Sequence, residues 1–352
     1  MDKLRYLPPG TAPATLIVPP EDQRVKSAVS LFEYDASSFQ EHRIETIDDL
    51  FPYLESEKIR WISIDGLGDI DFFQQLALHL RIHPLALEDI FNLGQRPKVD
   101  EYDRQLFIVL RLAYQDPQQG PMFEQVSIVL AERVVITVQE RSSEVFNPVR
   151  QRLRDGGGNA RFMRADYLAY ALIDAVTDQF FPIIESLGES LDIFRSALHH
   201  PPVQERVNEL HEFRSLIERI RRAVRPQRDL LGHLMRDESG LITERTKPYF
   251  RDCYDNTVLM LDLLESFRDS TRNFFDLYLM STSLRTNEMV RVLTIVASLF
   301  LPLTFIVGIY WMNFDPKQGP LYRSKLGWLI AIGLILSVTI ATVTFFKRKK
   351  WL

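Results

Sequence analysis

The sequence predicts an α+β domain followed by long helices, with two transmembrane helices near its C-terminal end. Two uncharged apolar runs, at residues 292–310 and 326–346, are each long enough to cross a bilayer core of about 30 Å as a helix. Residues 1–160 instead alternate strand-like and helical patterns, and a heptad pattern leads from the polar part into the first apolar run. Because two helices cannot enclose a polar path, a protein of this kind that moves solutes needs several copies around one pore.

Composition places most of the 352-residue chain outside the membrane, because 25% of its residues are charged. Cys253 is the only cysteine, so no disulfide can form within the chain. The sequence contains no P-loop, no nucleophile elbow, no zinc-ligand spacing and no glycine-rich phosphate loop, which argues against an enzyme. The net charge of −5 argues against a nucleic-acid partner.

The N-terminal part, residues 1–160, is predicted to be a mixed α/β cytoplasmic domain. Helical patterns at residues 71–81 and 85–91 separate its second strand-like run from the third. Three glycines at residues 156–158 mark a break at the end of this part. The strand-like runs, which are rich in β-branched and aromatic residues, lie at residues 28–32, 59–64, 106–110, 126–130 and 134–138.

Residues 161–291 are predicted to form a cytoplasmic bundle of long helices. The first helix covers residues 164–200, with Pro182 as a kink. The second covers residues 205–224, carries many charges of both signs and ends near Pro226.

The third helix is the predicted stalk. It begins near Pro248, which the first turn of a helix tolerates, and it has no stop signal before Pro302. It therefore leads directly into the first apolar run. Its apolar seam, which has one polar member, consists of Met260, Leu264, Phe267, Thr271, Phe274 and Tyr278.

Basic residues at the ends of the two spans indicate that both termini are cytoplasmic. The flanking segments carry Arg285, Arg291 and four basic residues at 347–350, whereas the connecting loop carries Lys317, Arg323 and Lys325. We therefore expect a multi-pass protein of the inner cell membrane, with the lipid bilayer as a partner. The expected segments are the first transmembrane helix at 292–312, an extracytoplasmic loop at 313–325, the second transmembrane helix at 326–346 and a basic cytoplasmic tail at 347–352.

Motifs distributed over nearly the whole chain resemble the CorA family of divalent-cation channels. They include His83-Pro84-Leu85, Leu87-Glu88-Asp89-Ile90 and residues 95–99, 165–168 and 248–252. Near the C-terminal end they include Asn287-Glu288 and residues 293–295, 302–306, 308–310 and 349–352. The resemblance implies a homopentamer with an α/β cytoplasmic funnel, a stalk helix that continues into a pore-lining first transmembrane helix, and an outer ring of second transmembrane helices.

The family's Gly-Met-Asn signature at the outer pore mouth corresponds here to Trp311-Met312-Asn313. The resemblance implies that Asn313, next to Met312, supplies a ring of amide oxygens for hydrated Mg²⁺, which gives up its waters reluctantly. Two interpretations of Trp311 stay open: it faces lipid at the membrane interface, or it alters or blocks conduction. The connecting loop is a second departure, because its net positive charge would repel divalent ions.

Further candidate pore positions lie along the first transmembrane helix and its approach. Threonine in such a helix often bonds its own backbone carbonyl, so that alternative stays open for both threonines. The polar or small positions are Asn287, Thr294, Thr304 and Gly308, and the candidate apolar constrictions that close by dewetting are Leu293 and Leu301.

Carboxylates in the cytoplasmic part are candidate ligands for regulatory Mg²⁺. In the family, residues that match Asp89 and Asp252 bind Mg²⁺ between neighbouring subunits, and a second site corresponds to Glu88, Asp174 and Asn256. Repulsion between these carboxylates would loosen the funnel, and bound Mg²⁺ would neutralise them and hold the pore shut. Asn256 stands where the family has histidine, which favours Mg²⁺ over Zn²⁺ or Co²⁺ at that site. The alternative for each acid is a solvated helix face.

The sequence therefore predicts a channel for Mg²⁺ influx that is gated by cytoplasmic Mg²⁺, with Co²⁺ and Ni²⁺ as further candidate ions. Two alternatives stay open because of Trp311. One is a related transporter of another divalent ion such as Zn²⁺. The other is a non-conducting Mg²⁺-sensing protein, which the basic loop also favours.

Overall fold

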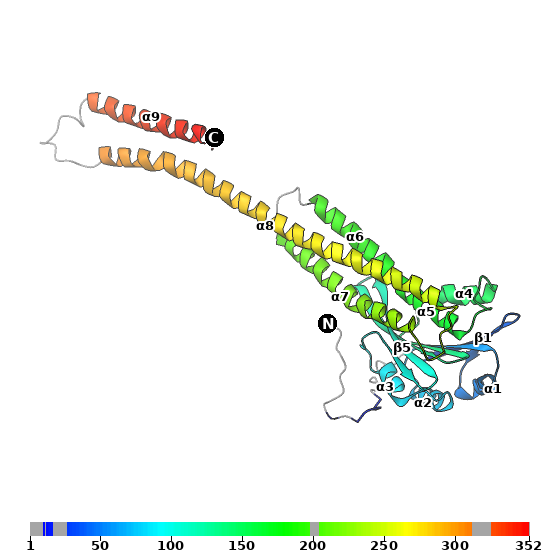
Figure 1. Ribbon diagram of the computed structural model, residues 1–352. Coiled ribbons are helices and arrows are strands. Elements are labelled where there is room, and N and C mark those ends of the chain that lie inside the picture. Colours follow the sequence, from blue (N-terminus) through cyan, green and yellow to red (C-terminus); the bar gives the residue numbers. More distant parts are fainter. Residues whose placement is uncertain (1–9, 11, 17–26, 198–203, 312–324, 352) are drawn as a thin grey trace. The chain divides into compact units, whose positions relative to one another are not determined.

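The computed structural model describes residues 10, 12–16, 27–197, 204–311 and 325–351 (Figure 1). The chain divides into two compact units, one formed by Met1–His199 with Glu205–Arg272 and the other by His200–Gln204 with Asn273–Leu352. The first unit contains an α/β domain and the beginning of a long helix. The second contains the apolar end of that helix and a further apolar helix.

Among the described residues, the first unit is centred on a seven-stranded sheet with the order β2-β1-β3-β7-β6-β5-β4. β3 and β7 pair in parallel, and the other neighbouring strands of this sheet pair antiparallel. The strands are β1 (Ala28–Tyr34), β2 (Phe39–Ile44), β3 (Ile59–Asp65), β4 (Lys98–Tyr102), β5 (Gln105–Asp116), β6 (Gly120–Leu130) and β7 (Val134–Gln139).

The five predicted strand-like runs are confirmed as β1, β3, β5, β6 and β7. The sequence missed β2 and β4, which are the two edges of the sheet. Both are short and rich in charged residues, with the sequences FQEHRI and KVDEY, so neither shows the apolar pattern of a buried strand. Charged residues are expected at an edge, because one side of the strand faces solvent.

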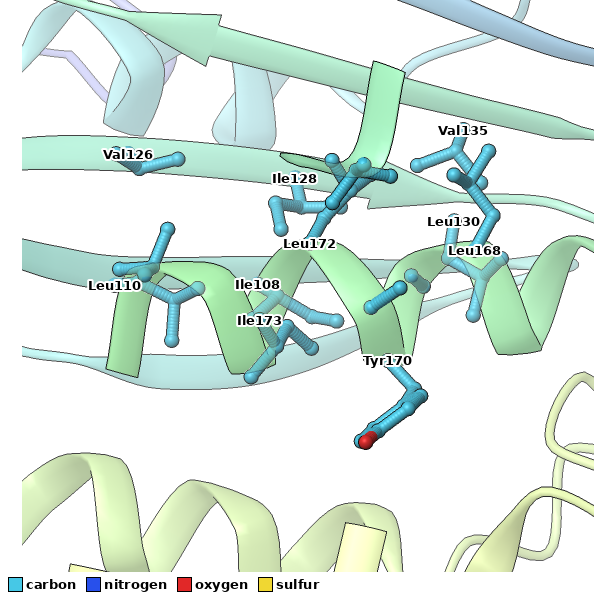
Figure 2. Close-up of a cluster of buried hydrophobic side chains, with 14 of the residues drawn as sticks. Ile108, Leu110, Val126, Ile128, Leu130, Val135, Leu168, Tyr170, Leu172 and Ile173 are labelled. Atoms are coloured by element: carbon cyan, nitrogen blue, oxygen red, sulfur yellow. The ribbon is translucent and has the colours of Figure 1, made fainter. Parts of the chain in front are cut away.

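Helices cover both faces of the sheet. One face carries the 3₁₀ turn η2 (Ile47–Asp49) and the helices α1 (Phe51–Leu54), α2 (Ile70–His79) and α3 (Pro84–Phe91). The other face carries α4 (Asn147–Asp155) and α5 (Ala165–Asp178). Figure 2 shows the second of these cores, in which Leu168, Leu172 and Ile173 of α5 lie against strand residues that include Ile108 and Ile128.

The prediction of one kinked helix over residues 164–200 is wrong. The chain instead forms two helices, α5 and α6 (Phe180–Ala197), which are separated at Gln179. Pro182 lies in the first turn of α6, where a proline disturbs no internal hydrogen bond, so it follows the break and does not kink a continuous helix.

The predicted end of the second long helix near Pro226 is also wrong. α7 (Gln204–Leu234) continues through Pro226 to Leu234. Leu230 and Leu231 beyond the proline are buried in the same core as α5. This burial offsets the hydrogen bond that the proline cannot donate.

The stalk helix is confirmed as α8 (Lys247–Trp311), a single helix of 65 residues that contains Pro302. Within the first unit, its predicted seam is buried at Met260, Leu264 and Thr271. α6 approaches the seam so closely that a Cβ at Gly188 would lie 3.0 Å from the ring of Phe267. The second apolar helix is α9 (Lys325–Arg348).

Candidate functional site

Three carboxylates gather where α5 meets the first turns of α8. Asp174 and Asp178 lie one turn apart on α5, and Asp252 lies on α8. The local fold holds them there because Phe250 and Cys253 of α8 are buried in the same core as the apolar side of α5. The two acids on α5 therefore lie at the edge of that core, beside the exposed side chain of Asp252.

The electrostatics of this cluster favour a cation. Burial and the charge of Asp178 raise the pKa of Asp174 to about 6, although the guanidinium of Arg152 opposes the shift. Burial and the charge of Asp252 likewise raise the pKa of Asp178. Asp174 and Asp178 are therefore held in a field that disfavours their negative charges, and a bound cation would relieve this repulsion.

Neighbouring side chains complete the cluster. Tyr170 makes a side-chain hydrogen bond with Asp174, and Figure 2 shows the Tyr170 ring directed away from the strand residues of the core. Asn256 lies one turn after Asp252 on α8 and is half-buried. Burial raises the pKa of Cys253, so this thiol stays neutral and uncharged beside the acids.

The second pair of predicted ligands, Glu88 and Asp89, lies on α3. Leu87 and Ile90 on either side of this pair are buried, so the helix directs the two acids outward. Asp89 accepts a hydrogen bond from the Gln95 amide at 2.7 Å and an ion-paired hydrogen bond from Lys98 Nζ at 2.6 Å. Its charge is thus already compensated within the chain.

Glu88 accepts a hydrogen bond through Oε2 from the backbone N–H of Ala14 at 2.6 Å. This contact attaches the described N-terminal segment, residues 12–16, to α3. Leu16 of that segment packs against the same core as α3.

The sheet separates the two groups of predicted ligands within one chain (Figure 1). α3 packs on the face that contains Ile62 and Phe107, whereas α5 and the start of α8 pack on the face that contains Trp61 and Ile108. The structure therefore brings Asp174 and Asp252 together but does not bring either to Asp89. Among the described residues, no three His, Cys, Asp or Glu side chains lie close enough to hold one metal ion.

The candidate pore residues that the structure describes lie on α8. A spacing of seven residues is close to two helical turns, so Asn287, Thr294, Leu301 and Gly308 share one side of the helix. A Cβ at Gly308 would meet no atom within 4 Å, so its backbone is open to approach. Leu293 and Thr304 lie to one side of this stripe, and Leu293 and Leu301 are each 68% exposed.

The two threonines bond their own helix, as the alternative interpretation anticipated. Thr294 donates to the carbonyl of Val290 at 2.7 Å, and Thr304 donates to the carbonyl of Phe300 at 2.9 Å. Each hydroxyl oxygen still has acceptor lone pairs, so these bonds are compatible with a contact to a hydrated cation. Met312 and Asn313 lie outside the described residues, and Trp311 ends α8.

Sequence reasoning assigned no function to Lys98 or Arg152, the two cations that face the predicted ligands. Lys98 belongs to one of the quoted motifs, but its separation from Asp89 matches no helical or strand period. Arg152 comes from α4, and only the packing of α4 beside α5 brings it near Asp174. No signal in the sequence could have paired either residue with its carboxylate.

An α/β domain whose last long helix continues into an apolar segment, followed by a second apolar helix, defines a class of membrane protein with two membrane-spanning helices. The family model of CorA-like Mg²⁺ transporter proteins matches residues 56–348. The chain is 38% identical over 347 residues to the cobalt/magnesium transport protein CorA of Thermotoga maritima, covering 98% of this chain and 97% of that protein. The chain therefore belongs to the CorA-like family of Mg²⁺ transporter proteins.

Two other proteins extend the comparison. A putative metal ion transporter of Bacillus subtilis, YfjQ, is 31% identical over 306 residues, which cover 85% of this chain and 92% of that protein. The solved structure of the CorA magnesium transporter of Methanocaldococcus jannaschii has a TM-score of 0.77 at 18% identity, covering 93% of this chain and 99% of that one. At this identity the likeness concerns the fold alone.

Proposed function

We propose that this protein conducts Mg²⁺ across the inner cell membrane into the cytoplasm, with Co²⁺ and Ni²⁺ as further transported ions. The observation that carries the proposal is the 38% identity to a cobalt/magnesium transport protein over 98% of this chain. The matching family model describes transporter proteins, which fits passage of the ion through a pore and does not call for an enzymatic activity. Both termini are assigned to the cytoplasm from the distribution of basic residues around the two helices.

The pore in this proposal is formed by the C-terminal part of α8 in a homopentamer. The stripe of Asn287, Thr294, Leu301 and Gly308 supports it, because these residues occupy one side of α8, which carries no charged residue from Val292 to its end. The side-chain oxygens of Asn287 and Thr294 would contact the water shell of Mg²⁺, and a ring of Leu301 side chains from the subunits would close the path beyond them by dewetting. Asn313 is assigned to the filter at the outer mouth.

Leu293 and Thr304, which lie beside the stripe, are assigned to the same pore wall. Rotation of α8 about its axis would bring them toward the path, since they lie on a neighbouring side of the helix. Met312 is assigned to the signature next to the Asn313 filter.

The gate in this proposal is a Mg²⁺ site shared between subunits. Asp89 of one subunit and Asp252 of the next would hold one ion, and Glu88, Asp174 and Asn256 would hold a second. The placement of α3 and α5 on opposite faces of one sheet supports a shared site, because a single chain cannot bring these acids together. A divalent ion between subunits would also offset the repulsion within the Asp174 cluster.

Trp311 favours two alternative functions. An indole in place of the family's glycine changes the size and chemistry of the pore mouth, so the transported ion would be another divalent cation such as Zn²⁺. The same indole could instead close the mouth, which would leave a Mg²⁺ sensor that does not conduct. The amide of Asn256 argues against Zn²⁺ as the regulatory ion.

Uptake by liposomes tests the proposal. The full-length protein is reconstituted with a trapped Mg²⁺-sensitive dye, and uptake is compared for Mg²⁺, Co²⁺, Ni²⁺ and Zn²⁺. We expect Mg²⁺ influx; uptake of Zn²⁺ alone would establish the first alternative. If the unchanged protein takes up none of these ions and the Trp311→Gly variant takes up Mg²⁺, the indole closes the pore mouth. Native mass spectrometry of the same preparation measures the number of subunits.

A further inference from the structure

Lys98 lies between two carboxylates at the edge of the sheet. Its Nζ is 2.6 Å from Asp89 Oδ2 on α3 and 2.5 Å from Asp100 Oδ2 on its own strand. The other oxygen of Asp89 accepts from the Gln95 amide at 2.7 Å. Both oxygens of the proposed metal ligand are therefore occupied by donors of the same chain.

The backbone explains why one ammonium reaches two acids. Lys98 and Asp100 are two residues apart on β4, so their side chains project from the same face of the strand. β4 is an edge strand, and α3 brings Asp89 over its first residue. The side chains of Lys98 and Asp100 are each 34% exposed and that of Asp89 is 14% exposed, so the ammonium is partly shielded but open to exchange.

We propose that Lys98 is a tethered competitor of Mg²⁺: it neutralises Asp89 when the ion is absent, and the arriving ion displaces it onto Asp100. Lys98 thereby sets the Mg²⁺ concentration at which the regulatory site fills. This inference rests on the proposed function of Asp89 as a ligand of regulatory Mg²⁺.

Charge and geometry both support displacement. One positive charge between two carboxylates leaves a net charge of −1, so the group still attracts a divalent cation. After Mg²⁺ binds Asp89, Asp100 still neutralises Lys98, and the ammonium needs only a small rotation because it already contacts both acids. Without Asp100, displacement would leave the ammonium beside Mg²⁺ with no partner, which is costly in a half-buried place.

A purely structural ion pair would behave differently. If Lys98 only fastened α3 to β4, removal of Lys98 or of Asp100 would weaken the same contact and change Mg²⁺ affinity in the same direction. Competition instead predicts opposite directions. Lys98→Gln should strengthen Mg²⁺ binding because the competitor is lost, and Asp100→Asn should weaken it because the displaced ammonium has no alternative partner.

The experiment is calorimetric titration of Mg²⁺ into the metal-free full-length protein in detergent micelles. We expect the apparent Kd to fall about fivefold in Lys98→Gln and to rise about fivefold in Asp100→Asn, as suits a partly exposed ion pair. When Asp100→Asn is added to Lys98→Gln, it should change the Kd little further, because Asp100 acts on Mg²⁺ binding only through Lys98. Lys98→Arg keeps the charge and should retain an affinity close to that of the unchanged protein.

Two control variants account for the loss of charge alone. Lys58→Gln removes a lysine of similar exposure that pairs with Glu33 at 3.7 Å, and Glu101→Gln removes an exposed acid next to Asp100. Neither should change the Kd for Mg²⁺ by more than about twofold. Equal effects of Glu101→Gln and Asp100→Asn would overturn the inference. They would show that Mg²⁺ affinity responds to the loss of any nearby negative charge, and that Asp100 is not a specific partner for the displaced ammonium.

The experiment distinguishes failure of the competition by Lys98 from failure of Asp89 as a ligand of regulatory Mg²⁺. If Asp89→Asn leaves Mg²⁺ binding unchanged, Asp89 is not a regulatory ligand and both proposals fall. If Asp89→Asn weakens binding but Lys98→Gln and Asp100→Asn shift it in the same direction or not at all, only the competition is wrong. Thermal unfolding of each metal-free variant checks that the fold is intact.

Discussion

The fully buried side chain of Gln227 on α7 accepts a hydrogen bond from the backbone N–H of Arg111 on β5 at 2.9 Å. β6 pairs with β5 as far as Asp116, but β4 pairs with it only as far as Val109, so the next part of β5 has no strand on its β4 side. Gln227 follows Pro226 directly, so the helix that continues through the proline also completes the edge of the sheet. α7 is thus tied to the sheet by a specific polar contact as well as by apolar packing.

Replacement of Gln227 by leucine should destabilise the first unit by about 1–3 kcal/mol, because the half-buried amide of Arg111 would lose this acceptor. Thermal unfolding of the full-length protein in detergent measures the change. Arg225→Gln, an exposed position on the same helix, serves as the control and should stay within about 0.5 kcal/mol. Equal stability of Gln227→Leu and the unchanged protein would show that another group satisfies the amide.

Gly188 on α6 should tolerate no larger side chain. Its Cβ would lie 3.0 Å from Phe267 Cζ on α8, so Gly188→Val forces the helices apart and should cost about 1–3 kcal/mol. Gly157→Ala is the control, because no atom lies within 4 Å of a Cβ there. Phe267→Leu should partly restore the stability of Gly188→Val by making room. A Gly188→Val protein as stable as the control would mean that α6 shifts freely.

The sequence was sufficient for the buried strands and for the stalk, because both carry strong apolar patterns. β7 consists of β-branched residues up to its last position, β3 carries three isoleucines and a tryptophan, and the seam of α8 recurs every three or four residues. It was insufficient where tertiary contacts outweigh local signals. Pro226 predicts a helix end, and only the burial of Leu230 and Leu231 in a distant core explains why α7 continues.

The candidate site divides in the same way. The acids Asp89, Asp252 and Asp174 could be proposed from the family resemblance. Their arrangement on opposite faces of the sheet could not, because it depends on how strands far apart in the sequence pair. The ion pair of Lys98 with Asp89 is likewise invisible in the sequence, since it depends on the position of α3 over the edge strand.

The Asp174 cluster should make the metal-free protein more stable in mild acid. The pKa of Asp174 in the folded protein is raised from its ordinary value of 3.8 to about 6, so protonation favours the folded state. This contribution is complete below about pH 4 and is lost as the pH rises through about 6. Thermal unfolding in EDTA should therefore show Asp174→Asn a few degrees more stable than the unchanged protein at pH 7.5.

The same comparison at pH 4.5 supplies the control for this prediction. There the carboxyl of Asp174 is largely protonated in the folded protein, so the advantage of Asp174→Asn should be much smaller than at pH 7.5. Added Mg²⁺ at pH 7.5 should also reduce the advantage, because the ion offsets the same repulsion in the unchanged protein. An advantage of equal size at both pH values would assign the effect to packing and not to charge.

Asn313→Ala should remove the preference for hydrated Mg²⁺. If its amide oxygen contacts the water shell of the ion, its loss from every subunit should reduce the ratio of Mg²⁺ to Na⁺ flux by about tenfold or more. The measurement is ion flux into liposomes with dyes for each cation. Gln318→Ala, in the same connecting loop, is the matched control. A preference for Mg²⁺ that survives Asn313→Ala would place the filter elsewhere on the pore.

Reversal of the charge at Asp89 or Asp252 should weaken closure of the channel by internal Mg²⁺. A lysine at either position repels the ion from the proposed shared site, so flux should continue at Mg²⁺ concentrations that close the unchanged channel. The assay is dye-monitored uptake by liposomes loaded with graded Mg²⁺, and Glu132→Lys, an exposed acid in the turn between β6 and β7, is the control. Because both acids would serve one ion, Asp89→Lys combined with Asp252→Lys should add little to either change alone. Normal inhibition by Mg²⁺ in both single variants would remove these acids from the gate.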